Sequence, residues 1–271
     1  MRLRDCWAPA LLIVLVVACW RLYLTEETRE RAVAIEAAEA SQRNVALAVA
    51  NHTAQLIERV RMYGFLLSND AGSDQNVRDG VRRALVQDAG ILQLMLLEGD
   101  GTSLFSTGRE AGDWLLDAAR KRIAAPGRGD HEAVPLMAPS SEQSAIGRLP
   151  LLHVIDGDRA LPPRSLVALL DLSDFPFLFG DMDLGETGEI ELADRQGQVL
   201  MRIRHRALAL DGSIASTQRL HQASSPHAPD AGTLVEFDAT GEARHFAYRR
   251  VEGSPLTVFV GQARSEILAT A

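Results

Sequence analysis

The most apolar stretch of the chain lies close to its N-terminus. Residues 6–20 carry no charge, and after Arg21 the apolar run resumes over residues 22–24. About nineteen such residues suffice for a helix across the hydrocarbon core of a bilayer, if Arg21 extends its head group to the interface. Two arginines within the first four residues place the N-terminus in the cytoplasm by the positive-inside rule. We therefore expect residues 1–24 to be an uncleaved transmembrane signal anchor.

Two other interpretations of this segment stay open. The sequence Val-Val-Ala-Cys that ends at Cys19 resembles a lipid-attachment box, in which the cysteine would carry the lipid. A cleaved signal peptide would need a small-x-small site, and residues 16–18 make a poor one. All three interpretations export the residues that follow.

From residue 25 to residue 68 the pattern is that of one long helix. There is no proline, and Ala, Glu, Arg and Gln dominate. Residues at spacings of three or four form a helical stripe, namely Val45, Val49, Thr53, Leu56, Val60, Tyr63 and Leu67. Forty-odd residues at 1.5 Å each make a rod of about 65 Å, which can run the height of a two-layer domain and pack along its side. We assign residues 25–72 to this stalk helix, with a coiled-coil stalk as the alternative.

Beyond the stalk, short helices and strands alternate in two similar cycles. Alternation of apolar residues and turn signals predicts strands at 91–97, 103–106, 148–155, 165–170, 188–193, 198–203, 233–237, 243–251 and 255–261. Apolar spacing predicts further helices after Ser73 and at 113–124, 173–179 and 265–271. Each cycle therefore holds about five strands with a helix before or between them.

An internal repeat relates the two cycles. At a shift of 96 residues, Leu94–Glu98 aligns with Ile190–Asp194, and the turn residue Gly101 aligns with Gly197. One antiparallel sheet with helices on a face is an α+β unit. The predicted fold is therefore α+β: an N-terminal membrane helix, a long stalk helix and two PAS-like antiparallel-sheet modules in tandem. Their bounds are 73–174 for the membrane-distal module, 175–264 for the membrane-proximal module, and 265–271 for the start of a C-terminal helix.

Composition and charge exclude several classes of function. The chain has 46% apolar residues and a formal charge of −8, and residues 25–271 carry 25 basic and 35 acidic residues, a net charge of −10. An acidic chain with dispersed arginines is a poor nucleic-acid binder, so we expect no such partner. Both cysteines lie in the first twenty residues, which leaves the exported part without a disulfide or a thiolate. The seven histidines form no zinc motif, no nucleophile elbow or phosphate loop occurs, and we expect no metal, no cofactor and no catalysis.

Three stretches in order, behind an anchor and a long helix, resemble the double Cache (tandem PAS-like) sensory region of bacterial membrane receptors. They are Leu166–Phe175, Leu184–Arg202 and Phe246–Gly261, and the resemblance covers about residues 31–268. It implies a periplasmic sensor anchored in the inner membrane and itself without catalytic activity, with a ligand pocket in the distal module and a relay in the proximal one. It also implies a homodimer and a cytoplasmic output domain, most often a diguanylate cyclase and next a histidine kinase, which is absent from these 271 residues.

The alternative is a membrane-anchored protein that stands alone and modulates a separate kinase, cyclase or transporter through direct contact. No cyclase, kinase or chemoreceptor signalling motif is present in the sequence. The coding sequence beyond residue 271 distinguishes the two hypotheses. A second apolar run with an output domain supports the receptor.

Four residues are candidates for the ligand pocket: Trp114, Arg148, His153 and Asp171. The resemblance assigns Asp171 the role of accepting a ligand's ammonium group, so a small amine or other cation is the expected ligand. The arginine–tryptophan–tyrosine motif of amino-acid-binding relatives is missing around residues 113–117, where only Trp114 falls near it. Two alternatives stay open: Asp171 caps the helix that begins near Ser173, and His153 belongs to the core or the surface.

Overall fold

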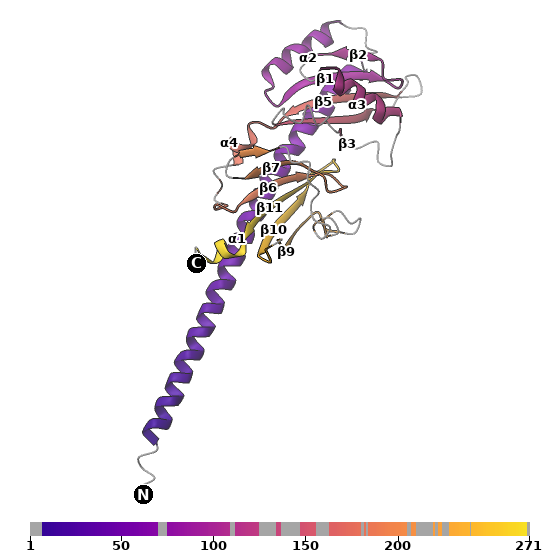
Figure 1. The fold of residues 1–271 in the computed structure, drawn as a ribbon. Coiled ribbons are helices and arrows are strands. Elements are labelled where there is room, and N and C mark those ends of the chain that lie inside the picture. The colour runs from indigo at the N-terminus through magenta and orange to yellow at the C-terminus, as the bar shows by residue number, and fades with distance from the viewer. Residues whose placement is uncertain are drawn as a thin grey trace.

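The computed structural model consists of two antiparallel sheets stacked along one long helix (Figure 1). It describes residues 7–69, 75–108, 112–124, 134–136, 147–155, 163–179, 182, 184–204, 207–209, 219, 222–223, 228–238 and 240–269. The predicted cap at Ser73 and most of the loop between the strands ending at 203 and beginning at 233 lie outside these residues. The α+β class with two sheets in tandem is confirmed.

The long helix α1 spans Trp7–Asn69, so the predicted anchor and stalk form one continuous helix. Every residue of the predicted stripe is buried. Val45 at its start and Leu67 at its end are each 3% exposed. The stripe packs on both sheets, which confirms a helix that lies along the modules. Within the described part of the chain, no helix is long and apolar enough to cross a membrane, and the membrane helix is not confirmed.

The distal sheet has the strand order β2-β1-β5-β4-β3, with all neighbours antiparallel. Its strands are β1 (Ile91–Glu98), β2 (Ser103–Ser106), β3 (Val134–Pro135), β4 (Arg148–Ile155) and β5 (Arg164–Asp171). The pair β4 and β5 is the predicted hairpin. The sequence does not predict β3, because two residues at a sheet edge carry no periodic signal.

The proximal sheet has the order β8-β7-β6-β11-β10-β9. Its strands are β6 (Glu189–Ala193), β7 (Val199–Arg204), β8 (Ala207–Ala209), β9 (Ala231–Phe237), β10 (Ala243–Arg250) and β11 (Thr257–Ala263). Apart from the short edge strand β8, which the sequence does not predict, this is the order of the distal sheet. The two hairpin turns also match, since Gly101 and Gly197 both adopt positive φ, at 83° and 81°, which glycine allows without strain. The predicted repeat is therefore present in the topology.

Four shorter helices complete the described fold. They are α2 (Gln75–Gln87), α3 (Gly112–Ala124), α4 (Phe175–Phe179) and α6 (Arg264–Ala269). Helix α2 contacts α1 at the distal end, and α3 packs on the face of the distal sheet that is remote from α1. Helix α4 joins the modules, and α6 begins the C-terminal helix against α1 (Figure 1).

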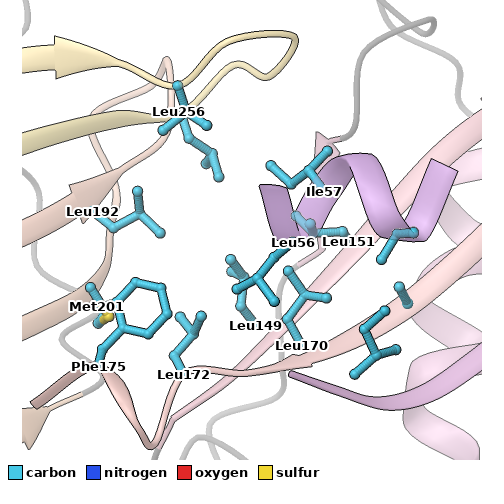
Figure 2. Close-up of a cluster of buried hydrophobic side chains, with 14 of the residues drawn as sticks. Leu56, Ile57, Leu149, Leu151, Leu170, Leu172, Phe175, Leu192, Met201 and Leu256 are labelled. Atoms are coloured by element: carbon cyan, nitrogen blue, oxygen red, sulfur yellow. The ribbon is translucent and has the colours of Figure 1, made fainter. Parts of the chain in front are cut away.

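One apolar core runs through both modules. Figure 2 shows its middle, where Leu56 and Ile57 of α1 lie near Leu149 and Leu170 of the distal sheet. Side chains of the proximal module continue the same cluster, among them Leu192, Met201 and Leu256. Because one helix supplies contacts to both sheets, the two modules share one core.

A polar contact ties α6 to the proximal module. The Glu266 carboxylate accepts hydrogen bonds from the Thr187 amide at 2.8 Å, from the Thr187 hydroxyl and from the Glu186 amide. Burial raises the pKa of Glu266, but these hydrogen bonds outweigh it and hold the pKa below its ordinary value. The ionised carboxylate therefore stabilises the first turn of α6 on the loop before β6.

We predict that Leu56→Ala destabilises the chain strongly. The side chain is 2% exposed, and its removal leaves a cavity in the core that both modules share, at a cost of about 2–5 kcal/mol. Urea denaturation followed by circular dichroism measures this loss. Leu66→Ala on the same helix is the control, because Leu66 is 45% exposed and its truncation should cost far less. Equal losses in the two variants would contradict the shared core.

We also predict that Glu266→Gln destabilises the chain at neutral pH, by about 1 kcal/mol for weakened charge-assisted hydrogen bonds. Since the folded pKa of Glu266 is lowered, its contribution is present above the unfolded pKa of about 4.3 and is lost as the pH falls through the folded pKa. The difference from the parent should therefore shrink in acid. Glu252→Gln, in an exposed turn, is the control and should cost far less stability at neutral pH.

Candidate functional site

The two faces of the distal sheet have different partners. Leu149, Leu151 and Leu166 point to the core on α1, whereas Leu152 and Val167 point to α3. The α1 face is closed by the long helix. Among the described residues, the α3 face is covered mainly by one short helix, which makes it the candidate face for a ligand.

Trp114 brings a polar donor to the α3 face. Its ring packs against the apolar cluster between α3 and the sheet. Its indole Nε1 is buried and has no hydrogen-bond partner in the described part of the chain. Buried donors in folded proteins almost always have an acceptor, either in the protein or in a bound molecule. The Trp114 N–H is therefore available to an acceptor that enters between α3 and the sheet.

Gln93 is a polar residue that the sequence analysis missed. It is only 3% exposed in β1, and its Nε2 donates to the Gly108 carbonyl at 2.8 Å, at the start of the connection to α3. Alternate residues of a strand point to the same face, so Gln93 lies on the α3 face together with Met95 and Leu97. A single amide in the otherwise apolar run 91–97 is the signal that could have found it, because a buried polar side chain needs a hydrogen-bond partner.

Arg148 and Asp171 are direct partners across β4 and β5, at the end of the sheet that faces the proximal module. Arg148 has the parity of Leu152 and belongs to the α3 side of the sheet, whereas Asp171, the last residue of β5, lies at the margin beside residues of α1. The Asp171 Oδ1 accepts the Ser173 amide at 2.9 Å. This bond lies in the turn before α4 (Phe175–Phe179), so the alternative that Asp171 caps a helix beginning near Ser173 is not confirmed.

His153 lies apart from the other three candidates. It pairs with Leu166, which points to the core on α1, and thus stands on the face opposite to Trp114. Its position agrees with the alternative of a core role. The structure therefore brings Trp114 and Arg148 to one side of the distal sheet, holds Asp171 at the sheet margin, and separates His153 from them.

The corresponding face of the proximal sheet is filled by its own ion pairs. Glu191 is fully buried and pairs with Arg202 at 2.6 Å and with Arg219. The Arg219 guanidinium also stacks over the Phe246 ring, 4.5 Å from its centroid. Glu189 pairs with Arg244 at 3.0 Å. Since these charges satisfy one another, the proximal face offers a ligand less than the distal face does.

The distal α3 face can thus bind a hydrogen-bond acceptor. The Trp114 indole N–H is a donor without a partner among the described residues, and such a donor can hold a carboxylate or carbonyl oxygen. The loops expected to complete the pocket, between residues 109 and 155, lie outside the described residues at 109–111, 125–133 and 137–146. No catalytic pair of nucleophile and base is formed by the site residues described above.

Comparison with known proteins places the fold. No family model and no curated protein sequence matches the chain significantly. Among solved structures, the extracellular domain of rpHK1S-Z16, which is described as a histidine kinase, is 19% identical, with 88% of this chain and 100% of that chain covered and a TM-score of 0.64. The extracellular domain of mmHK1S-Z2, described likewise, is 13% identical, with 87% and 99% covered and a TM-score of 0.55.

A third structure is the ligand-binding domain of Mlp24 with asparagine, at 13% identity, with 88% of this chain and 98% of that chain covered and a TM-score of 0.50. At these identities the likeness establishes the fold alone. It agrees with the topology, in which one long helix carries two sheets of the same strand order. The chain therefore has the double Cache-like fold of extracellular sensor domains, as the resemblance of its sequence predicted.

Proposed function

We propose that this chain is the extracytoplasmic ligand-sensing region of a membrane-bound signalling receptor. Structures of the same fold support this, since two are extracellular domains of proteins described as histidine kinases and one is a ligand-binding domain with asparagine. The region itself catalyses no reaction. It relays the binding of a small molecule to a cytoplasmic output domain, a diguanylate cyclase in the first instance and a histidine kinase in the second.

The ligand binds on the α3 face of the distal module. The observation that carries this proposal is the Trp114 indole N–H, which is buried and has no acceptor among the described residues. Arg148 at the sheet margin adds a positive charge on the same side. A ligand with a carboxylate or carbonyl oxygen would satisfy the indole and pair with the guanidinium.

The relay runs through the shared core. Helix α1 packs on both sheets, and α6 lies against both α1 and the proximal sheet. A ligand that favours one packing of the distal sheet on α1 therefore shifts the population of arrangements in which α1 and α6 meet. Coupling of this kind needs no contact between the ligand and α6.

Residues 1–24 are proposed to anchor the chain in the inner membrane, with residues 25–271 in the periplasm. The apolar side chains over residues 11–17 of α1 support this, because each is more than half exposed, Val17 least at 54%. Such a band is costly in water and stable in hydrocarbon.

The receptor is proposed to be a homodimer in which the lower halves of two α1 helices meet. Residues 26–41 of α1 line a groove of about 610 Å³ that extends to Ile267 of α6. Val33 is 58% exposed at this groove, and the neighbouring Ala34 and Ala37 are small enough for a second helix to approach closely.

We predict that a thermal-shift screen of the full chain in detergent against amino acids and small carboxylic acids finds a ligand. Trp114→Phe should then weaken its binding about three- to tenfold, the value of one hydrogen bond to an uncharged donor, and Arg148→Gln about tenfold or more. Calorimetric titration measures both changes. Lys121→Gln on α3 is the control for lost positive charge and should bind as the parent does. If no compound binds, or if both variants bind as tightly as the parent, the proposed site is wrong.

We predict that Val33→Cys, with Cys6 and Cys19 replaced by serine, forms a disulfide-linked dimer on mild oxidation. Two helices that meet at this groove bring the two thiols within bonding distance. Non-reducing electrophoresis measures the linked fraction. Arg31→Cys, on the other side of the helix, is the control and should cross-link much less. Equal cross-linking at both positions would argue against a specific α1 interface.

A further inference from the structure

Helix α1 becomes attached to the proximal sheet close to Glu39. From residue 11 to residue 41 of the helix no residue is buried, and Gln42 is the first that is, at 0% exposed. The buried stripe follows from Val45 onward. Residues 39–42 therefore mark the lower end of the contact between α1 and the proximal module, where the helix leaves the module (Figure 1).

A contact between a histidine and a carboxylate lies at this point. Nδ1 of His245, in β10, is 3.0 Å from Oε1 of Glu39. The His245 side chain is only 9% exposed and the Glu39 side chain 23%. His245 stands on the α1 side of the sheet, because its neighbour Phe246 belongs to the cluster on the remote face. The contact thus joins helix and sheet directly and is largely shielded from water.

The strands around His245 bring no further charge close to it. Its partners across β9 and β11 are Val235 and Gln262, which are both uncharged. The preceding residue of β10, Arg244, points to the opposite face, into the ion pairs already described. Arg249 shares the face of His245 but stands four residues further along β10, about 13 Å away. Among the described residues, the charges closest to His245 therefore come from the helices.

Two carboxylates reach this part of the sheet from helices. Glu266 of α6 is held by amides of the loop before β6 and is already used. Glu39 of α1 is the carboxylate in contact with His245, and its second oxygen, Oε2, lies 3.8 Å from Arg43, whose side chain is about half exposed. The Glu39 carboxylate therefore stands between an arginine on its own helix and a histidine on the sheet.

This pair of residues responds to pH. Histidine is the side chain that most readily changes its charge between pH 5 and 8. As a neutral ring, His245 makes one hydrogen bond of ordinary strength with Glu39. As an imidazolium it donates to an anion at a site shielded from water, and such charge-assisted hydrogen bonds are about twice as strong as neutral ones. Protonation of the ring therefore strengthens the attachment of α1 to β10.

Gln42 weakens the packing beside this contact. It is three residues along α1 from Glu39, and neither its Nε2 nor its Oε1 has a hydrogen-bond partner among the described residues. A buried amide without a partner costs free energy, so the lower end of the contact is less stable than a purely apolar one would be. One stronger hydrogen bond therefore has a larger effect here than in the apolar part of the stripe.

We propose that the Glu39–His245 contact attaches α1 to the proximal module in a proton-dependent manner. In acid the imidazolium holds residues 36–46 of α1 against β10, and at higher pH the lower end of the contact opens more often. Since α6 contacts both α1 and β10, this opening also changes how α6 lies on α1. The inference goes beyond the proposed function, because it requires neither the ligand nor an output domain and makes acidity a separate input.

The test compares the parent with His245→Gln and Glu39→Gln, each as the full chain in detergent, at about pH 8 and about pH 5.5. Hydrogen exchange of residues 36–46 is read by mass spectrometry and compared between proteins at the same pH, so the intrinsic effect of pH on exchange cancels. At the lower pH we expect exchange about threefold or more faster in either variant than in the parent. At the higher pH the difference should be smaller. The melting temperature of the parent should exceed that of either variant by about 2–4 °C more in acid than at the higher pH.

His52→Gln is the matched control, because the same substitution should act there in the opposite direction. The His52 ring stands edge-on to Phe175, with centroids 5.2 Å apart. Burial, and next the charge of Arg59, lower the pKa of His52. The unfolded chain then takes up this proton more readily than the folded one, so the parent loses stability relative to His52→Gln as the pH falls below about 6.5.

A double variant decides whether the two residues act together. The difference between Glu39→Gln and Glu39→Gln/His245→Gln should not increase in acid, because the carboxylate that rewards the protonated ring is gone. Circular dichroism verifies that each variant is folded, and Glu39→Gln alone carries the comparison if His245→Gln is not. The proposal is overturned if the folded variants differ from the parent equally at both pH values, or if the effect of His245→Gln still grows in acid when Glu39 is replaced.

Discussion

The packing of α1 on both sheets is the interaction on which the rest of the structure depends. Its stripe from Val45 to Leu67 is buried throughout and belongs to one core cluster with side chains of both modules. Each sheet alone has an apolar face that needs a partner, and one helix serves both. The shared helix also covers one face of each sheet, which leaves the faces remote from α1 for other contacts.

The two modules use these remaining faces differently. In the distal module, α3 covers the remote face and leaves the Trp114 indole N–H without an acceptor among the described residues. In the proximal module, Glu191 and Arg219 form a buried ion pair on the corresponding face. Buried charges are tolerated only when they are paired and hydrogen-bonded. The same strand order thus carries an indole N–H without an acceptor among the described residues in one module and a set of mutually paired charges in the other.

Much of the fold could be predicted from the sequence, and the site only in part. The predicted strands and helices from residue 91 onward coincide with the observed ones to within a few residues. The sequence did not predict β3 and β8, because edge strands of two or three residues are too short to show an alternation of apolar and polar positions. Of the four candidate residues, Trp114 and Arg148 lie on one side of the distal sheet, but His153 lies on the other. Strand alternation shows that neighbours differ in face; it does not say which face the long helix covers.

The sequence by itself determined the helical stripe of α1, the two cycles of strands and the repeat marked by Gly101 and Gly197. These are local properties, set by the periods of helix and strand and by the backbone freedom of glycine. Only the tertiary structure decided which face of each sheet α1 occupies, and with it that His153 and Trp114 lie on opposite faces of the distal sheet. The physical reason is that these faces are set by contacts between residues that are distant in the chain, which no local period encodes.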